Sequence, residues 1–549
     1  MQKLAHGLLI VALSLTGCGL VPDLGPSVTV SIVYGSEKRE WLAPLVEAYN
    51  ASGQKTASGA TIKIEATAMG SIEAVDGILA GSIQPTVWSP ASSLYIPLAN
   101  ERWRQSHSGD LVTGNPSNLV LSPVVIAMWR PMAEALGWPA TELGWSDIAK
   151  LATSEAGWAA YGYPEWGRFK FGHTHPEFSN SGLSAVLAQA YAGAGNPRTL
   201  TADGLSQAGP LMTEIQSSLI HYGTSTGFFG ERMFERGPSY LSAAVLYENL
   251  VVAQESKRLA GQSQQLSVVA IYPKEGTFTA NHPYIVLSAS WVTDEQREAA
   301  EAFEAFLLDR PQQLKALELG FRPADVGIPF TAPLDVQHGV DTSQPRNELA
   351  APDAATLEAT TQLWRENKKP VDLVAVIDIS GSMGGDKIAA ARTSLSQFIG
   401  RLADQDRIQV IAFNDTSVSM GPLAPLVEVR QDLQRRVGAI SESGGTALYD
   451  AVGTAVSDLA VNGDPNHIRA IVVLSDGEDT ESASSLDQVL AQIGQSGEGG
   501  DSIKVFTIAF GGDASTDVLT QIAESTGARM YEGKPDDIER VYAEIATFF

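Results

Sequence analysis

After residue 370 the chain alternates short apolar runs with longer amphipathic stretches. The apolar runs predict strands at 372–379, 407–413, 468–474, 503–510 and 528–532, with a weaker edge strand near 417–420. Helices are predicted between them, at 385–403, 428–440, 446–460, 484–494, 515–525 and 535–547. Alternation of this kind is typical of a mostly parallel sheet with helices on both faces. We therefore expect a doubly wound α/β domain over residues 371–549.

Oxygen-bearing side chains gather where two of these predicted strands end. Asp378, Ser380 and Ser382 stand at the carboxyl end of the first strand, Asp476 follows the third, and Thr446 stands at the start of a predicted helix. Right-handed crossovers bring the carboxyl ends of parallel strands to one rim, where open α/β sheets bind their ligands. Carboxylate and hydroxyl oxygens suit a hard divalent cation. The alternative is that the hydroxyls cap helices and Asp476 belongs to a turn.

The segments 378–383, 443–446 and 475–478, in this order, resemble the metal-ion-dependent adhesion site (MIDAS) of the von Willebrand factor A family. The resemblance implies a Rossmann-like domain that binds Mg²⁺, with Mn²⁺ or Ca²⁺ possible, through Asp378, Ser380, Ser382, Thr446 and Asp476. It implies that the three hydroxyls bind directly and that the two carboxylates act largely through bound water. An acidic side chain of a protein partner would then complete the metal's coordination shell.

The N-terminus predicts export and an anchor. Lys3 precedes a short apolar stretch at 7–15, which is too short to span a bilayer, and the stretch is followed by Cys18. Residues 15–18 resemble the lipobox of bacterial lipoproteins, and Cys18 is the sole cysteine. We expect a signal peptide at 1–18, acylation of Cys18, and a tether at 19–26. The alternative is a plain secretory signal with a chance cysteine.

Composition and the absence of several motifs exclude other classes of function. The net charge of −26 and the pI near 4.7 argue against nucleic-acid binding, which needs clustered Lys and Arg. They also argue against electrostatic docking on anionic lipid. The sequence has no GxxxxGK[ST] or HExxH motif. We therefore expect that the protein is not an enzyme.

Residues 27–345 predict a second α/β unit, joined to the C-terminal domain by a helical linker at 346–370 that ends in Pro370. The order of its elements resembles the type II extracellular solute-binding proteins of ABC transporters. Matching pieces are 179–182, 247–249, 282–284 and 320–324. The resemblance implies a two-lobed clamshell, typical of periplasmic binding proteins, and we place the lobe crossings near 121–129 and 267–273.

In that family the ligand lies between the lobes, so the resemblance implies a small polar or anionic solute. The candidate residues are Gly35, Ser36, Trp88, Ser89, Ser179, Asn180, Ser181, Thr224, Ser225, Thr226 and Tyr247. Hydroxyls and helix-start amides suit an anion, but the same groups also cap helices, and the cleft could serve only as a scaffold. His173 and His175 have no third His or Cys beside them and are interpreted as an ordinary loop pair.

Together these patterns predict a lipid-anchored cell-envelope protein, on the outer side of the cytoplasmic membrane or in the periplasm. Its C-terminal domain would bind a divalent metal and capture a protein partner through a carboxylate, while the clamshell binds a solute or has been repurposed. The alternative function is a substrate-binding lipoprotein of an ABC transporter with an accessory A domain.

Overall fold

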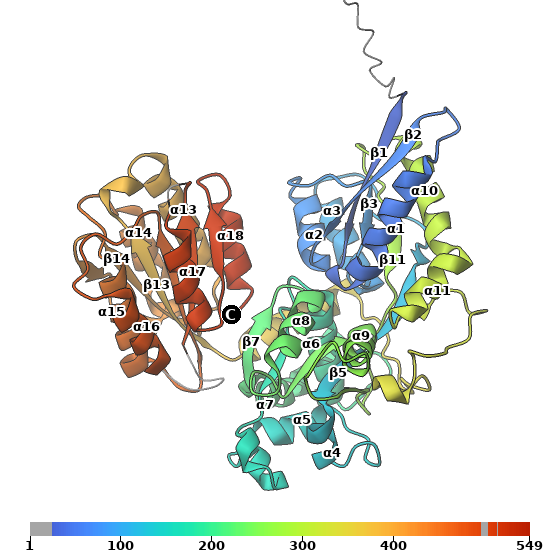
Figure 1. Ribbon diagram of the computed structural model, residues 1–549, viewed down its shortest axis with the longest axis horizontal. Helices are drawn as coiled ribbons and strands as arrows, with labels where there is room; N and C mark the ends of the chain where they lie inside the picture. Colours follow the sequence, from blue (N-terminus) through green and yellow to red (C-terminus); the bar gives the residue numbers. More distant parts are fainter. Residues whose placement is uncertain (1–24, 496–502, 513) are drawn as a thin grey trace, which may run out of the picture.

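The computed structural model describes residues 25–495, 503–512 and 514–549, and it shows two lobes and a separate C-terminal domain (Figure 1). The predicted signal peptide, Cys18 and most of the tether lie outside the described residues. Within these ranges no helix combines the length and the apolar character needed to cross a membrane.

The C-terminal domain is the mostly parallel sheet that the sequence predicts. Its strand order is β15-β14-β13-β17-β18-β19, and all neighbours pair in parallel except β15, which is antiparallel to β14. A short antiparallel strand on β14, Ala424–Pro425 (β16), was not predicted. The other strands are β13 Val371–Asp378, β14 Arg407–Phe413, β15 Ser417–Ser419, β17 Ile468–Ser475, β18 Lys504–Phe510 and β19 Met530–Gly533.

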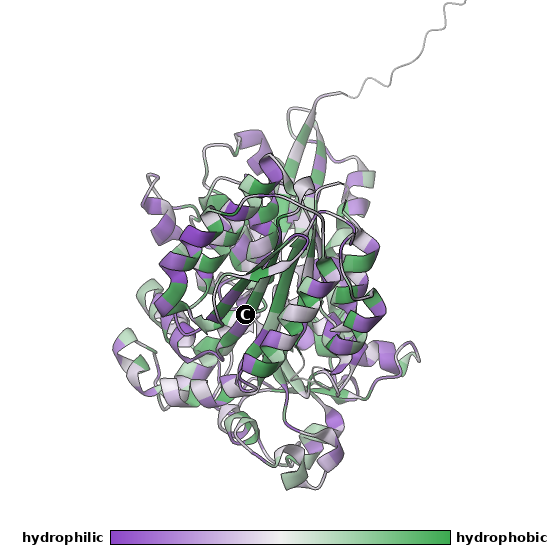
Figure 2. Ribbon diagram, turned by 90° about the vertical axis from the view of Figure 1, so that its left-hand side faces the viewer, coloured by the Kyte–Doolittle hydropathy of each residue, from purple (hydrophilic) through white to green (hydrophobic). Residues whose placement is uncertain are grey.

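Helices cover both faces of this sheet, which explains why its strands are almost entirely apolar. Leu373 and Ala375 of β13 pack into one buried cluster, whereas Val374 and Val376 pack into another. Figure 2, where this domain faces the viewer, shows green strands between helices that carry purple polar residues. The helices are α13 Asp386–Arg401, α14 Leu426–Gly438, α15 Leu448–Asn462, α16 Leu486–Gln495, α17 Thr516–Ser525 and α18 Ile538–Ala546.

The first lobe is built on a five-stranded sheet of order β2-β1-β3-β11-β4. Its strands are β1 Ser27–Tyr34, β2 Thr61–Ala68, β3 Val87–Ser89, β4 Ser117–Asn118 and β11 Pro283–Val286. Its helices are α1 Arg39–Ser52, α2 Ser71–Leu79, α3 Ile96–Arg104, α10 Asp294–Leu308 and α11 Arg310–Glu318. In Figure 1 this lobe contains the blue elements from the start of the described chain together with the yellow-green helices α10 and α11.

The second lobe has a seven-stranded sheet of order β10-β5-β8-β6-β7, with β9 and β12 also pairing with β5. Its strands are β5 Val120–Trp129, β6 Phe171–Thr174, β7 Leu219–Gly223, β8 Ala243–Tyr247, β9 Val268–Ile271, β10 Thr279–Ala280 and β12 Arg322–Pro323. Its helices are α4 Arg130–Ala135, α5 Trp145–Ala152, α6 Asn180–Gly193, α7 Gly209–Ser217, α8 Thr226–Arg236 and α9 Glu248–Leu259.

The two lobe crossings differ in how well the sequence located them. The first crossing falls between β4 and β5, next to the predicted stretch 121–129. The second falls later than 267–273, because β9 still pairs with β5 and the chain rejoins the first sheet only between β10 and β11. A run of apolar residues identifies a strand, but it does not say to which sheet the strand belongs.

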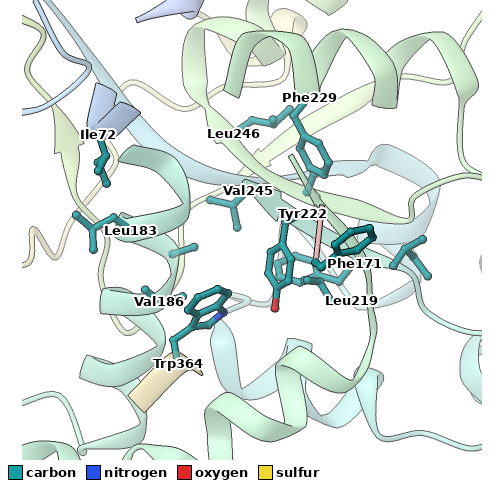
Figure 3. Packing of buried hydrophobic residues seen from close by; sticks show 14 of the residues in the cluster. Ile72, Phe171, Leu183, Val186, Leu219, Tyr222, Phe229, Val245, Leu246 and Trp364 are labelled. Carbon is teal, nitrogen blue, oxygen red and sulfur yellow. The ribbon is translucent and has the colours of Figure 1, made fainter. Parts of the chain in front are cut away.

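A buried junction joins the second lobe to the C-terminal domain. Helix α12, Ala354–Asn367, places Trp364 edge-on against Tyr222 of β7, with ring centroids 5.4 Å apart (Figure 3). Lys369 Nζ donates to the carbonyl of Leu219 (3.1 Å), and the Tyr222 amide donates to the carbonyl of Phe548 (3.3 Å). Strand β7 is therefore bonded to both the start and the end of the C-terminal domain.

Candidate functional site

Three loops meet at the carboxyl edge of the C-terminal sheet. Strand β13 ends at Asp378, and its parallel neighbour β17 ends at Ser475. The turn after β13 continues into a short 3-10 helix, Gly381–Met383. The loop before α15 docks on this turn, because the Gly381 amide donates to the carbonyl of Gly444 (3.0 Å).

Four of the five predicted metal-site residues form one hydrogen-bonded group. The Ser380 amide donates to Asp378 Oδ1 (2.8 Å), and the hydroxyls of Ser380 and Ser382 lie 2.9 Å apart. The Ser382 hydroxyl donates to Asp476 Oδ1 (2.7 Å). Side chains from two different strand ends are thereby connected.

Thr446 borders the same space. A Cβ atom at Gly477 would lie 3.6 Å from Thr446 Oγ1 and 3.7 Å from Ser382 Oγ. The backbone of Thr446 is held by Thr480, whose hydroxyl accepts from the Thr446 amide (3.0 Å) and whose amide donates to the Thr446 carbonyl (2.8 Å). The structure thus brings all five predicted residues to one rim.

The site has a buried floor and an open mouth. Asp378, Ser380, Thr446 and Asp476 are buried, whereas Ser382 is exposed. The two carboxylates therefore lie beneath a hydroxyl that faces solvent. Such an arrangement holds charge in a region of low dielectric constant while leaving access from outside.

Two further residues adjust the charge of this floor. The Ser475 hydroxyl donates to Asp378 Oδ2 (2.6 Å), and Lys387 Nζ lies 2.6 Å from Asp476 Oδ2. Burial raises the pKa of Asp378 and the nearby charge of Asp476 adds to the rise, although hydrogen bonds from Ser380 and Ser475 oppose it. The net pKa of Asp378 is raised.

Sequence reasoning did not assign Ser475 or Lys387. Ser475 had a usable signal, because it directly precedes Asp476 at a strand end, but nothing in the spacing pairs Lys387 with a carboxylate across the sheet. Asp479, which the sequence left unassigned, has a structural role. Its Oδ2 accepts from the amide of Tyr449 (3.0 Å) in the first turn of α15.

The group of donors fits a hard cation. All the side-chain atoms that face one another here are oxygens from carboxylates and hydroxyls, apart from Lys387 Nζ. Over the described ranges, no three His, Cys, Asp or Glu residues are grouped so that they could hold a metal. Any cation at this rim therefore depends on the hydroxyls, and oxygen-only sets of this kind favour Mg²⁺, Mn²⁺ or Ca²⁺.

The candidate solute residues come from both lobes of the clamshell. The first lobe supplies Gly35, Ser36, Trp88 and Ser89, and the second supplies Ser179, Asn180, Ser181, Thr224, Ser225, Thr226 and Tyr247. Many of them bond to one another. Ser36 Oγ donates to Ser225 Oγ across the lobes (3.0 Å), Thr226 Oγ1 donates to Ser181 Oγ (2.7 Å), and Asn180 Nδ2 donates to the Tyr247 hydroxyl (3.1 Å).

The remaining candidates have different environments. Ser179 Oγ lies 3.2 Å from Thr226 Oγ1. Thr224 is half-buried in the loop that precedes α8. The Ser89 carbonyl accepts from the Gly35 amide (3.2 Å). The Ser89 hydroxyl and the indole N–H of Trp88 are buried and have no hydrogen-bond partner within the described chain. Most of the polar groups here are satisfied by protein atoms.

A charged cluster that the sequence did not reveal lies among these residues. Lys38 Nζ lies 3.2 Å from Glu37 Oε1 and 3.2 Å from His282 Nδ1, and it donates to the carbonyls of Ser89 (3.0 Å) and Pro90 (3.2 Å). Lys38 and His282 are fully buried, and Glu37 is nearly so. In the sequence, Ser-Glu-Lys is an ordinary helix start and gives no sign of this pairing.

The cluster shifts the titration of its members. Burial alone would raise the pKa of Glu37, but the charge of Lys38 and hydrogen bonds from His282 and from the Glu37 amide lower it to about 2. Burial lowers the pKa of Lys38, and burial together with the Lys38 charge lowers the pKa of His282 to about 4. At neutral pH Glu37 is therefore a carboxylate and His282 a neutral imidazole.

Of the histidine pair that the sequence placed in a loop, His175 lies in the connection after β6, but His173 does not. His173 lies in strand β6 with its Nε2 3.0 Å from Gln216 Nε2. His175 packs edge-on against Trp364, with ring centroids 4.8 Å apart. Both side chains are buried parts of the junction.

Two family models match this chain. The model described as bacterial extracellular solute-binding protein matches residues 30–322, which is more than half of the chain. The model of the von Willebrand factor type A domain matches residues 372–542. Domains of the latter class often bind a divalent metal and mediate protein interactions, and the former class indicates a periplasmic or envelope location.

Several known proteins are similar to parts of the chain. An uncharacterized protein of Mycobacterium tuberculosis is 22% identical over 535 residues, which cover 92% of this chain and 74% of that one. An Arabidopsis thaliana E3 ubiquitin-protein ligase, WAVH1, is 28% identical over 196 residues, which cover 33% of this chain and only 28% of its own length. A solved periplasmic thiamin binding protein is similar at 10% identity and a TM-score of 0.45, over 62% of this chain and 96% of that one.

The family matches agree with the architecture, which has a two-lobed α/β clamshell followed by a parallel α/β domain with an oxygen-lined rim. This chain belongs to the bacterial extracellular solute-binding protein family and carries a von Willebrand factor type A domain at its C-terminal end.

Proposed function

We propose that this protein captures a partner protein through a divalent metal at the rim of its A domain. The observation that carries the proposal is the convergence of Asp378, Ser380, Ser382, Thr446 and Asp476, from three separate segments, at one rim with an open mouth. We further propose that the protein is a binding protein and not an enzyme.

The chemistry of capture follows from the ligand types. Hydroxyls carry no charge, so Mg²⁺ held mainly by Ser380, Ser382 and Thr446 would keep most of its positive charge. That charge attracts an external carboxylate, which the partner's Asp or Glu supplies. Asp378 already accepts hydrogen bonds at both oxygens, from the Ser380 amide and the Ser475 hydroxyl. It retains acceptor capacity for water and contributes charge from below the rim.

Cys18 provides the proposed attachment to the envelope. Acylation of this sole cysteine would anchor the chain through a short tether, which would place the A domain outside the cytoplasmic membrane. Labelled palmitate should enter the wild type and not Cys18→Ser. Equal labelling of both proteins would refute the anchor and would leave the proposal of a metal site unaffected.

The metal-dependent capture is tested by substituting the buried carboxylate. Asp378→Ala removes charge from the floor of the site, so calorimetry should show Mg²⁺ binding weakened by about 10- to 100-fold. Partners recovered from envelopes with Mg²⁺ should disappear with Asp378→Ala and with EDTA. The matched control is Asp386→Ala, an exposed carboxylate in the first turn of α13, which should behave as wild type. Mg²⁺ binding of unchanged affinity in Asp378→Ala would refute the proposed site.

A further inference from the structure

The carboxylate of Glu37 lies directly over the first candidate solute loop. A Cβ atom at Gly35 would come within 2.6 Å of Glu37 Oε2 and 2.8 Å of its Cδ. Glu37 therefore folds back over the loop and occupies the space above it. Real Cβ atoms essentially never lie closer than 3.0 Å to another heavy atom, so only glycine at position 35 leaves room for this arrangement.

The counter-charge for this carboxylate is fixed in place. Lys38 Nζ is surrounded by Glu37 Oε1, two backbone carbonyls and His282 Nδ1, all within 3.2 Å. His282 holds a left-handed backbone conformation, with φ of 39°. A non-glycine residue is strained in this backbone region. Such strain persists only where the contacts around the residue hold it in place. The cluster is thus a built anion site within the first lobe, and Glu37 fills it.

The second lobe closes on this site without room for a solute. A Cβ atom at Gly227 would lie 2.9 Å from Ser36 Oγ and 3.2 Å from the Glu37 amide nitrogen. The Phe178 carbonyl accepts from the amide of Ile72 across the lobes (3.2 Å). The cavity lined by Ser36, Glu37 and Gly227 has a volume of about 50 Å³. Pockets for small molecules usually enclose about 300–1,000 Å³, so this one admits only a few water molecules.

We propose that Glu37 is a built-in ligand: its carboxylate takes the place of an anionic solute and pairs with Lys38 inside the clamshell. A free anion must lose translational freedom to bind, whereas Glu37 is already attached two residues from Gly35. The side chain therefore outcompetes external carboxylates at ordinary concentrations. The clamshell then acts as a support for the A domain and not as a solute receptor, and this holds whether or not the A domain binds a metal.

Chemical rescue tests the proposal in the full chain. Glu37→Ala leaves a cavity shaped like a carboxylate beside Lys38, and acetate is the matching probe. We expect Glu37→Ala to melt at a lower temperature than wild type, and acetate at millimolar concentration should restore several degrees in a saturable manner. Wild type should not respond beyond a sodium chloride control. All samples contain EDTA, so that acetate cannot report on a metal at the A domain.

The matched control is Glu65→Ala, which removes an exposed carboxylate of the same lobe and should show no acetate response. Adding Lys38→Met to Glu37→Ala should abolish the rescue. A folded Glu37→Ala protein that ignores acetate would overturn the proposal. A saturable rise in the melting temperature of wild type with acetate, phosphate or sulfate would overturn it too. Because this wild-type measurement needs no variant, it decides the question even if Glu37→Ala does not fold.

Discussion

The rim of the A domain and the crevice of the clamshell both contain a carboxylate paired with a lysine, but they differ in how that lysine is held. Lys387 is 24% exposed and reaches Asp476 from the start of α13. Lys38 is fully buried, and it donates to Glu37 Oε1 and to the carbonyls of Ser89 and Pro90. A partly exposed lysine can leave when another cation arrives, whereas a buried lysine with a full set of partners cannot. The first site is therefore open to exchange and the second is closed.

The largest expected difference between the two regions is their response to acid. The clamshell buries His173, His175, His221 and His282, whereas the only histidine of the A domain, His467, is partly exposed. Burial lowers the pKa of His173 to about 4 and that of His221 to about 3, and it holds the pKa of His175 well below its ordinary value.

The sign of the effect follows from these directions. Each folded-state pKa lies below the unfolded value of 6.5, so the unfolded chain binds more protons. Stability is therefore complete above pH 6.5 and falls as the pH drops from 6.5 toward 4. Over this pH range each such histidine lowers the free energy of unfolding by on the order of a few kcal/mol. Hydrogen exchange from pH 7 to pH 4.5 should show the clamshell opening before the A domain. Equal loss of hydrogen-exchange protection in the clamshell and the A domain would contradict the expected difference between them.

A smaller effect is expected at the rim of the A domain. Lys387→Met removes the ammonium that competes for Asp476, so Mg²⁺ should bind roughly three- to tenfold more tightly by calorimetry. Lys534→Met, at an exposed position of the same domain, is the control and should change nothing. If Lys387→Met instead weakens Mg²⁺ binding, Lys387 positions Asp476 and is not an exchangeable counter-ion.

The smallest effect should come from the surface of the clamshell. Arg39 and Glu231 bridge the lobes at 2.8 Å, but their side chains are 44% and 47% exposed. Exposed pairs contribute little, so Glu231→Ala should change the free energy of unfolding in urea by less than about 1 kcal/mol. A loss as large as that of Glu37→Ala would mean that this surface ion pair contributes as much to the free energy of unfolding as the buried carboxylate does.

The sequence predicted the A domain well because its strands are covered on both faces. The apolar run of β14 was located at Arg407–Phe413, and the other parallel strands lie within a few residues of their predicted bounds. Because strand ends of a parallel sheet share one rim, the convergence of Asp378 and Asp476 could also be anticipated.

The interior of the clamshell could not be predicted in the same way. The pairing of Lys38 with Glu37 and His282 joins residues 244 positions apart, and it depends on β3 and β11 being neighbours in one sheet. Whether hydroxyls bind a solute or one another is decided by how far the two lobes approach. Local sequence carries no information about that distance.

The double attachment of strand β7 has a mechanical consequence. The A domain enters through Lys369, bonded to Leu219, and leaves through Phe548, bonded to Tyr222. A force applied to the rim would therefore load two points of the same strand together. Separation of the two domains would then require both hydrogen bonds and the packing of Trp364 on Tyr222 to be lost together. The A domain should therefore resist rotation away from β7 under tension.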